Sequence, residues 1–271
     1  MKSRTKTILS GKHLEIELFP VTAHGHRHDR RRKLSRAEQR KQNEKHAVKK
    51  LVRLINANFV QGDTIITLQY RAELRHDLSY AAVLRDVQNY LRRVKAYRHR
   101  HHLPETKYIY VIELAGKDNW HAHLIMSKLD RDVAESLWHY ADFVNSRSFQ
   151  PTAQEGGAAF ANYIAGKKGG KDAPERYWRK WNSSKNLTQP TENTKDGTHS
   201  RREIARLARE RVDDRAYWEQ LYSGYRFVSA QPVFNEFNGW WYLYVQLYRI
   251  EPRTVRRPSA GMHTAAMQRK T

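Results

Sequence analysis

The chain has 271 residues, of which 50 are Lys or Arg and 28 are Asp or Glu, so its formal net charge is 50 − 28 = +22 at pH 7. Such an excess favours a polyanionic partner, most often nucleic acid, over the small substrates of a metabolic enzyme. Cysteine is absent, which excludes disulfides, thiolate nucleophiles, iron–sulfur clusters and cysteine-ligated zinc.

We expect neither a membrane span nor a secretory signal. The longest apolar runs, such as 108–112 and 240–243, are far shorter than the roughly 18 residues that a membrane-spanning helix needs. The basic residues near the N-terminus are not followed by an apolar stretch. These features predict a cytoplasmic protein with no membrane partner.

Residues 1–59 are predicted to form a basic N-terminal arm and helix. An alternating run at 13–18 is typical of an edge strand, and 24–33 is almost wholly basic, as in a flexible arm. Ser35 stands three residues before Glu38, which is the spacing of a helix-capping box. Residues 1–58 hold sixteen basic and five acidic side chains, so 16 − 5 = +11 of the net charge lies there.

The central segment, 60–182, shows the alternation of helices and strands typical of an α+β domain. The expected elements, in chain order, are a strand at 63–70, a helix at 79–102, strands at 108–115 and 120–127, a helix at 130–140, a strand at 143–149 and a helix at 157–166. We therefore predict an α+β fold with a central antiparallel sheet, flanking helices and a C-terminal helix and β-hairpin block.

The C-terminal third changes in composition. Residues 183–198 are polar and predict a mobile linker. A helix at about 199–222 and two apolar-rich runs joined by Asn238-Gly239 predict a helix and hairpin over 199–252, because Asn-Gly is a strong hairpin signal. The tail at 253–271 is basic and unpatterned, which is typical of disorder.

The hairpin at 108–127 carries two histidines in an apolar strand. His121 and His123 share one face, because residues i and i+2 of a strand point the same way. Glu113 on the preceding strand reaches that face only if it pairs opposite one of these histidines, which requires an odd-numbered loop. The opposite face would then carry the apolar core.

Two imidazoles and a carboxylate suit a hard or borderline divalent ion with open positions for a substrate oxygen. The same set would suit a non-haem iron oxygenase, although an oxygenase of small molecules has no need of a charge of +22. The purely structural alternative is that both histidines form hydrogen bonds within the fold and that Glu113 is exposed to solvent.

Forty residues after His123, the helix at 157–166 presents Tyr163, with Lys167 one turn later on the same face. A tyrosine is a poor nucleophile near its free pKa of about 10. A cation beside it and a metal that polarises the target phosphate can make it competent. Packing alone would be the ordinary role of a lone tyrosine.

Together these motifs resemble the HUH endonucleases, and specifically the rolling-circle replication initiators of plasmids and phages. The similar segments are Ile65 to Leu68, then Glu113 with the pair at His121 and His123, then Tyr163 with Lys167. The stretch from Trp181 to Thr188 is similar to phage-type members, so the resemblance covers about 60–190. The family's usual lysine position is occupied by Gly166, which leaves Lys167 and Lys168 as alternatives for the assisting lysine.

The resemblance implies a ferredoxin-like or RNA-recognition-like palm that binds Mg²⁺ or Mn²⁺ at Glu113, His121 and His123. It implies that Tyr163, assisted by Lys167, cuts one strand of origin DNA and keeps a 5′-phosphotyrosine link, leaving a free 3′-hydroxyl. It also implies single-stranded and origin DNA as partners, with host helicase and polymerase acting on the product. The chain would be a single-tyrosine, single-strand endonuclease and strand transferase.

Basic residues outside these motifs are candidates for phosphate contacts. They are Arg92, Arg93, Arg98, Lys168, Lys171, Lys49, Lys50 and Arg53. Two other functions stay open at this point: a non-catalytic protein that binds single-stranded nucleic acid by charge and stacking, and a transposase or relaxase with the same chemistry.

Overall fold

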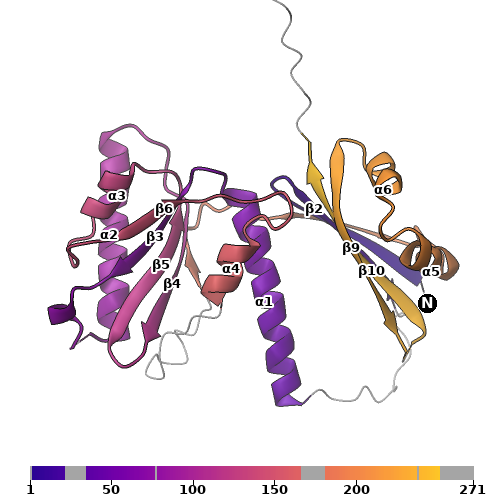
Figure 1. Ribbon diagram of the computed structural model, residues 1–271, viewed down its shortest axis with the longest axis horizontal. Coiled ribbons are helices and arrows are strands. Elements are labelled where there is room, and N and C mark those ends of the chain that lie inside the picture. The colour runs from indigo at the N-terminus through magenta and orange to yellow at the C-terminus, as the bar shows by residue number, and fades with distance from the viewer. Residues whose placement is uncertain (1, 22–34, 77, 166–180, 237, 251–271) are drawn as a thin grey trace, which may run out of the picture.

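The computed structural model describes residues 2–21, 35–76, 78–165, 181–236 and 238–250. These residues form two five-stranded antiparallel sheets, with the long helix α1 (Arg36–Asn58) between them (Figure 1). The mixed α+β class expected from the sequence is confirmed. The expected division into folding units stays a prediction.

The first sheet is built from the central part of the chain and has the strand order β6-β3-β5-β4-β7. Its strands are β6 (Asn145–Ser148), β3 (Thr64–Gln69), β5 (Asn119–Met126), β4 (Tyr108–Ala115) and β7 (Asn182–Ser183). The strands expected at 63–70, 108–115, 120–127 and 143–149 all lie in this sheet.

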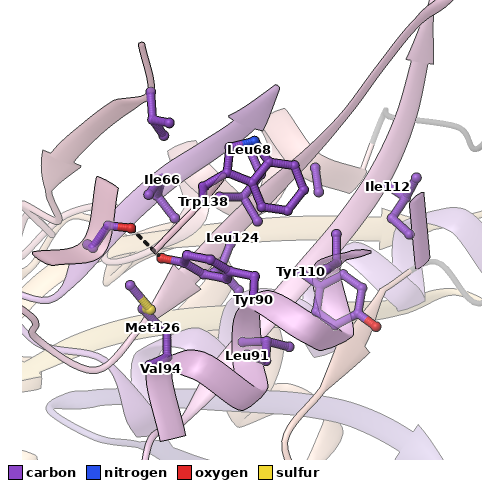
Figure 2. Close-up of a cluster of buried hydrophobic side chains, with 14 of the residues drawn as sticks. Ile66, Leu68, Tyr90, Leu91, Val94, Tyr110, Ile112, Leu124, Met126 and Trp138 are labelled. Atoms are coloured by element: carbon purple, nitrogen blue, oxygen red, sulfur yellow. Dashed lines mark hydrogen bonds between the residues drawn. The ribbon is translucent and has the colours of Figure 1, made fainter. Parts of the chain in front are cut away.

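Two helix layers cover the first sheet. Helices α2 (Tyr80–Arg100) and α3 (Arg131–Ser136) pack on one face, where the side chains of alternate strand residues form an apolar cluster (Figure 2). The Tyr90 hydroxyl donates to the Ala134 carbonyl at 3.0 Å inside this cluster. Helix α1 and helix α4 (Ala158–Ala165) pack on the other face, against Ile109, Val111 and Ile125. A 3-10 turn, η1 (Ala72–Leu74), precedes α2.

Helix α1 begins at the capping box predicted from the sequence. Ser35 Oγ accepts from the backbone N–H of Glu38, and the Glu38 carboxylate accepts from the backbone N–H of Ser35 at 2.8 Å. Near its C-terminal end, α1 buries Leu51 and Ile55 against the first sheet. On its other side, Lys49 and Arg53 form ion pairs with Glu15 and Glu17 of the second sheet, so the helix joins the two halves of the protein.

The second sheet has the order β8-β1-β2-β10-β9 and combines both ends of the described chain. Its strands are β8 (Thr191–Asp196), β1 (Lys2–Ser10), β2 (His13–Val21), β10 (Trp240–Arg249) and β9 (Tyr225–Asn235). Helices α5 (Arg201–Glu210) and α6 (Arg215–Leu221) cover the face turned away from α1 (Figure 1). The hairpin expected at Asn238-Gly239 is present, with Gly239 at a φ of 63°.

Three expectations for these elements were wrong. The strand at 13–18 is an inner strand, because β2 pairs with both β1 and β10. The expected linker at 183–198 contains β8, which pairs with β1. The single helix expected at 199–222 is two helices, because the turn at 211–214 ends α5 and Asp214 caps α6 by accepting from the Tyr217 N–H at 3.0 Å.

Strand β1 was not predicted, since its inward positions hold hydroxyl residues where an apolar alternation would be expected. Ser3 and Thr5 are buried, and Ser3 Oγ donates to the His199 carbonyl. Thr5 Oγ1 lies 2.5 Å from Thr198 Oγ1. Because these hydroxyls find partners, the strand is buried without an apolar pattern.

The basic arm expected at 24–33 and the tail expected at 253–271 lie outside the described residues. Across the ranges that the structure does describe, no helix combines the length and the apolar character needed to cross a bilayer.

Candidate metal and tyrosine site

The β4–β5 hairpin brings Glu113, His121 and His123 onto one face of the first sheet. Three residues, 116–118, join the two strands, so the loop is odd-numbered and Glu113 pairs directly opposite His121. The flanking Val111 and Ile125 share this face, while Ala122 and Leu124 point into the core on the other face. The register that the sequence analysis required is therefore present.

The three side chains converge on one point. Glu113 Oε2 lies 2.9 Å from Nε2 of His121 and 3.1 Å from Nε2 of His123. One ligand atom from each of the three residues lies within 4.8 Å of the others. The side chains are 13%, 12% and 4% exposed, respectively, so the cluster is largely shielded from solvent.

A second layer of contacts orients the imidazoles. Nδ1 of His121 lies 3.0 Å from the Asn119 carbonyl, and Nδ1 of His123 lies 3.2 Å from Thr67 Oγ1. The Asn119 carbonyl can only accept, so a hydrogen bond here requires the proton on Nδ1 of His121, and the neutral ring then has Nε2 free to bind a cation shared with Glu113. Such outer contacts fix ring orientation in metal sites.

The donor set fits a divalent cation. It contains two imidazole nitrogens and a carboxylate oxygen, without a thiolate, and three protein ligands leave coordination positions of such an ion for water or substrate oxygen. Structural zinc sites use four protein ligands, whereas this cluster supplies three.

Helix α4 places Tyr163 beside the cluster. Phe160, Ala161 and Ile164 anchor α4 on the same sheet face that carries the histidines. The Tyr163 hydroxyl lies 3.4 Å from Nε2 of His123, and the two rings meet edge to face at 4.8 Å between centroids. Tyr163 is 48% exposed, so a large ligand can reach its hydroxyl.

The loop before α4 is seated on the end of α1. The Gly157 N–H donates to Oδ1 of Asn56 at 2.7 Å. A Cβ at Gly157 would lie 2.3 Å from Cγ2 of Ile55, which is too close for any real contact. The glycine therefore allows the chain to approach α1 closely, and this contact sets where Tyr163 lies.

Two features of this neighbourhood were not singled out as site residues from the sequence. Thr67 lies within the β3 motif, and its pairing opposite His123 could have been inferred from strand alternation once the sheet order was known. The role of Asn56 depends on a contact between residues 101 apart, for which the sequence carries no local signal.

The structure does not describe Lys167, Lys168 or Lys171. Their predicted roles, as the assisting lysine and as DNA-binding residues, lie outside the described residues.

Helix α2 lies on the sheet face opposite the metal cluster, so its arginines are not brought to the site. Arg92 is exposed, and Arg93 donates from Nε to the Leu137 carbonyl at 2.8 Å. Arg98 is only 5% exposed and donates to the carbonyls of Pro104 and Lys128 at 2.6 and 2.9 Å. Burial lowers the pKa of Arg98. This guanidinium supports the fold, so we leave it out of the DNA surface proposed below.

The basic residues of α1 meet acidic residues of β2. Arg53 contacts Glu15 at 2.6 Å and Glu17 at 2.9 Å, and Lys49 contacts Glu17 at 2.6 Å. Burial alone would raise the pKa of Glu17, but Lys49 and Arg53 outweigh burial and hold the pKa below its ordinary value. Lys50 is exposed. It lines a cavity of about 660 Å³ together with His46 and Lys49.

The fold and site thus define an α+β protein with a candidate His–His–Glu cation site and a tyrosine in contact with one ligand. Residues 63–168 match a family model of replication-associated proteins, described as the ORF2 type. The matched segment contains Thr67, the metal cluster and Tyr163, so the resemblance to rolling-circle replication proteins is confirmed for this part of the chain. The match supports a replication-associated role and DNA as a binding partner. Searches of the curated proteins and of the solved structures find no match.

Proposed function

We propose that the protein is a rolling-circle replication initiator that nicks one strand of origin DNA with Tyr163 as the nucleophile. The observation that carries this proposal is the 3.4 Å distance between the Tyr163 hydroxyl and Nε2 of His123, a member of the candidate metal cluster. Because His123 belongs to the candidate cation site and contacts Tyr163, the tyrosine oxygen and a bound cation would be close enough to act on the same phosphate. The match to replication-associated proteins supplies the substrate class.

The reaction is a transesterification. The Tyr163 oxygen forms a bond to phosphorus, and the bond between phosphorus and the 3′ oxygen of the preceding nucleotide breaks. The phenol proton is lost to a base, and the departing 3′ oxygen takes up a proton. The products are a 5′-phosphotyrosine ester and a free 3′-hydroxyl that can prime synthesis. Because the phosphotyrosine ester replaces the phosphodiester bond that was broken, a 3′-hydroxyl can later attack it, so the strand can be transferred or religated.

The residues of the chain have distinct parts in this proposal. Glu113, His121 and His123 would hold Mg²⁺ or Mn²⁺, and Thr67 would keep the His123 ring in place. When bound, the metal supplies Lewis-acid polarisation of a phosphate oxygen and neutralises charge. Lys167 or Lys168 would stabilise the phosphate or the phenolate.

Exposed basic residues would hold other parts of the DNA: Lys50 with Lys49 on α1, the lysines that follow α4, and Arg92 on the opposite face of the first sheet. Each would contact the backbone phosphates and carry no sequence information by itself. In this function the protein acts on DNA in the cytoplasm of its host, where a helicase and a polymerase would extend the 3′ end. A transposase or relaxase would use the same chemistry on another DNA.

The test is an adduct assay. The full chain is incubated with labelled single-stranded origin DNA and Mn²⁺, and a denaturation-resistant protein–DNA adduct is sought on a gel. We expect the adduct with the unaltered protein, its loss with chelator, and its loss in Tyr163→Phe and His121→Ala. Tyr97→Phe, on α2 across the sheet, is the matched control and should keep the adduct. Chelator-insensitive binding without any adduct would instead indicate the non-catalytic alternative.

A further inference from the structure

Helix α5 carries a row of arginines on its outer face. Ile204, Leu207 and Ala208 are buried against the second sheet. At 100° per residue, Arg202, Arg206 and Arg209 fall within an arc of about 60° on the opposite side of the helix, and all three are exposed. The row is about 10 Å long, which is the axial length of about three phosphates on one DNA strand.

The row places like charges side by side on one helix face. Like charges three and four residues apart on a helix destabilise it, and Arg206 stands at these spacings from both Arg209 and Arg202. Among the described residues, no carboxylate forms an ion pair with any of the three. Of the two acidic residues on α5, Glu203 accepts from the Ser200 N–H in the capping box and Glu210 lies at the helix end.

Aromatic side chains of the β9–β10 hairpin continue the surface. The Arg209 guanidinium lies 5.7 Å from the centroid of the Trp241 ring. The Phe234 ring is 5.2 Å from that of Trp241 and is 46% exposed. Charge on the helix and apolar side chains at the hairpin end thus form one continuous face.

This face lies across the second sheet from the tyrosine site. Figure 1 shows α5 on the far side of β2, β9 and β10, and α1 and α4 on the near side. DNA held at Tyr163 and DNA that meets Arg202, Arg206 and Arg209 would therefore lie on opposite sides of the second sheet. DNA on this face would be the DNA that flanks the cut. The outer side of a helix is convex, which suits a duplex groove better than a single strand.

We propose that Arg202, Arg206 and Arg209, with Phe234 and Trp241, form a second DNA-binding surface that holds duplex DNA flanking the nick site. The arginines contact backbone phosphates, and the exposed apolar side chains contact the groove wall. The choice of DNA as the ligand rests on the function proposed above. The surface itself is distinct from the metal and tyrosine residues, so binding can be measured without cleavage.

The test is equilibrium binding of the full chain to a fluorescein-labelled duplex of about 30 base pairs, about three helical turns, in chelator. The variant combines Arg202→Gln, Arg206→Gln and Arg209→Gln. The matched control removes the same charge from exposed positions elsewhere in the same half of the protein, with Lys195→Gln, Arg215→Gln and Arg226→Gln. Because each phosphate contact contributes about 0.9 to the slope of log K against log salt, we expect the test variant to lose about 2 to 3 from that slope.

The expected result is duplex binding roughly tenfold weaker at about 0.1 M salt in the test variant, with the control variant close to the unaltered protein. A variant with three Arg→Lys changes keeps the charge and should keep the salt slope. This result would attribute the loss in the Gln variant to the removed charge and not to misfolding. Equal losses in test and control variants, or a loss only for a single-stranded probe of the same length, would overturn the proposal.

The adduct assay separates this proposal from the nicking function. The Gln variant should still form the adduct on a short single-stranded oligonucleotide, because the Tyr163 site is untouched. If the unaltered protein forms no adduct at all, the nicking function fails while the duplex measurement still stands. If the Gln variant binds duplex normally, the surface assignment fails while the nicking function stands.

Discussion

The Tyr163 hydroxyl lies 3.4 Å from Nε2 of His123, although forty residues separate them in the chain. Two separate parts of the fold produce this contact. The β4–β5 hairpin sets the histidine face, and the seat of the α4 entry loop on α1 sets the tyrosine. Changes to either support should therefore affect the site without removing a residue that touches DNA.

Thr67→Val should weaken metal binding. The substitution replaces the hydroxyl that lies 3.2 Å from Nδ1 of His123, so the ring loses the contact that holds its orientation. Loss of such an outer contact typically costs about 10- to 100-fold in metal affinity. Calorimetric titration with Mn²⁺ measures it. Thr7→Val removes a hydroxyl in the second sheet and is the control. An affinity equal to that of the unaltered protein would show that Thr67 does not orient the ligand.

Substitutions of Arg53 and Lys50 should have different effects: the first should lower stability, and the second should weaken DNA binding. Arg53→Ala leaves Glu15, which is 5% exposed, without its guanidinium partner, and unpairing a buried charge typically costs about 3–5 kcal/mol. Lys50→Ala, at an exposed position, should change the free energy of unfolding by less than about 0.5 kcal/mol. It should lower the salt slope of DNA binding by about 1.

Urea unfolding and salt-dependent DNA binding of both variants make this comparison. Arg53 was predicted from the sequence as a DNA-binding residue, and its ion pairs with Glu15 and Glu17 could not be foreseen. If Arg53→Ala kept full stability and lost DNA affinity as Lys50→Ala does, the structural role of Arg53 would be wrong.

Gly157→Ala should displace the tyrosine helix. The added Cβ would lie 2.3 Å from Cγ2 of Ile55, and overpacking of this kind typically costs about 1–3 kcal/mol. Adduct formation should slow in the same variant, because α4 carries Tyr163. Adding Ile55→Ala removes the clashing methyl group, so the double variant should lose less stability than the sum of the single variants. Strict additivity in urea unfolding would contradict the contact.

His13 should make stability depend on pH. Burial lowers the pKa of His13, although the nearby charge of Glu15 opposes this. The unfolded chain therefore takes up a proton near the ordinary pKa of about 6.5, while the folded protein resists it. The contribution of His13 is fully present above that pH and is lost as the pH falls toward the lower folded value.

Thermal melting between about pH 7.5 and 5 measures this dependence. His13→Phe keeps an aromatic ring against Tyr248, which meets His13 edge to face at 5.0 Å. Its melting temperature should fall less steeply with acid than that of the unaltered protein. Parallel curves for the two proteins would assign the acid sensitivity to other groups.

Local patterns predicted four strands of the first sheet and the shared face of His121 and His123. The capping box at Ser35 and the alternation of apolar and polar residues around His121 are features of neighbouring residues, and they fix a helix start and a sheet face without reference to the rest of the chain. The register was not predicted, because the expected strands at 108–115 and 120–127 leave a four-residue turn, whereas three residues, 116–118, join β4 and β5.

The second sheet could not be predicted in the same way. Residues 13–18 of β2 pair with residues 243–248 of β10, and no local pattern says which distant strand will be the partner. In β1, buried Ser3 and Thr5 hide the alternation that marks a strand. The burial of Arg98 on α2 could not be predicted from local patterns either, because its side chain is held by the carbonyls of Pro104 and Lys128.

The most direct test of the central claim is to locate the phosphate in the adduct. The protein–DNA adduct formed with Mn²⁺ is digested with nuclease and protease, and tandem mass spectrometry identifies the residue that keeps the nucleotide. We predict a nucleotide phosphate on the hydroxyl of Tyr163 and on no other of the fifteen tyrosines. A nucleotide on another residue, or cleaved DNA with no covalent peptide, would contradict the assignment of Tyr163 as the nucleophile.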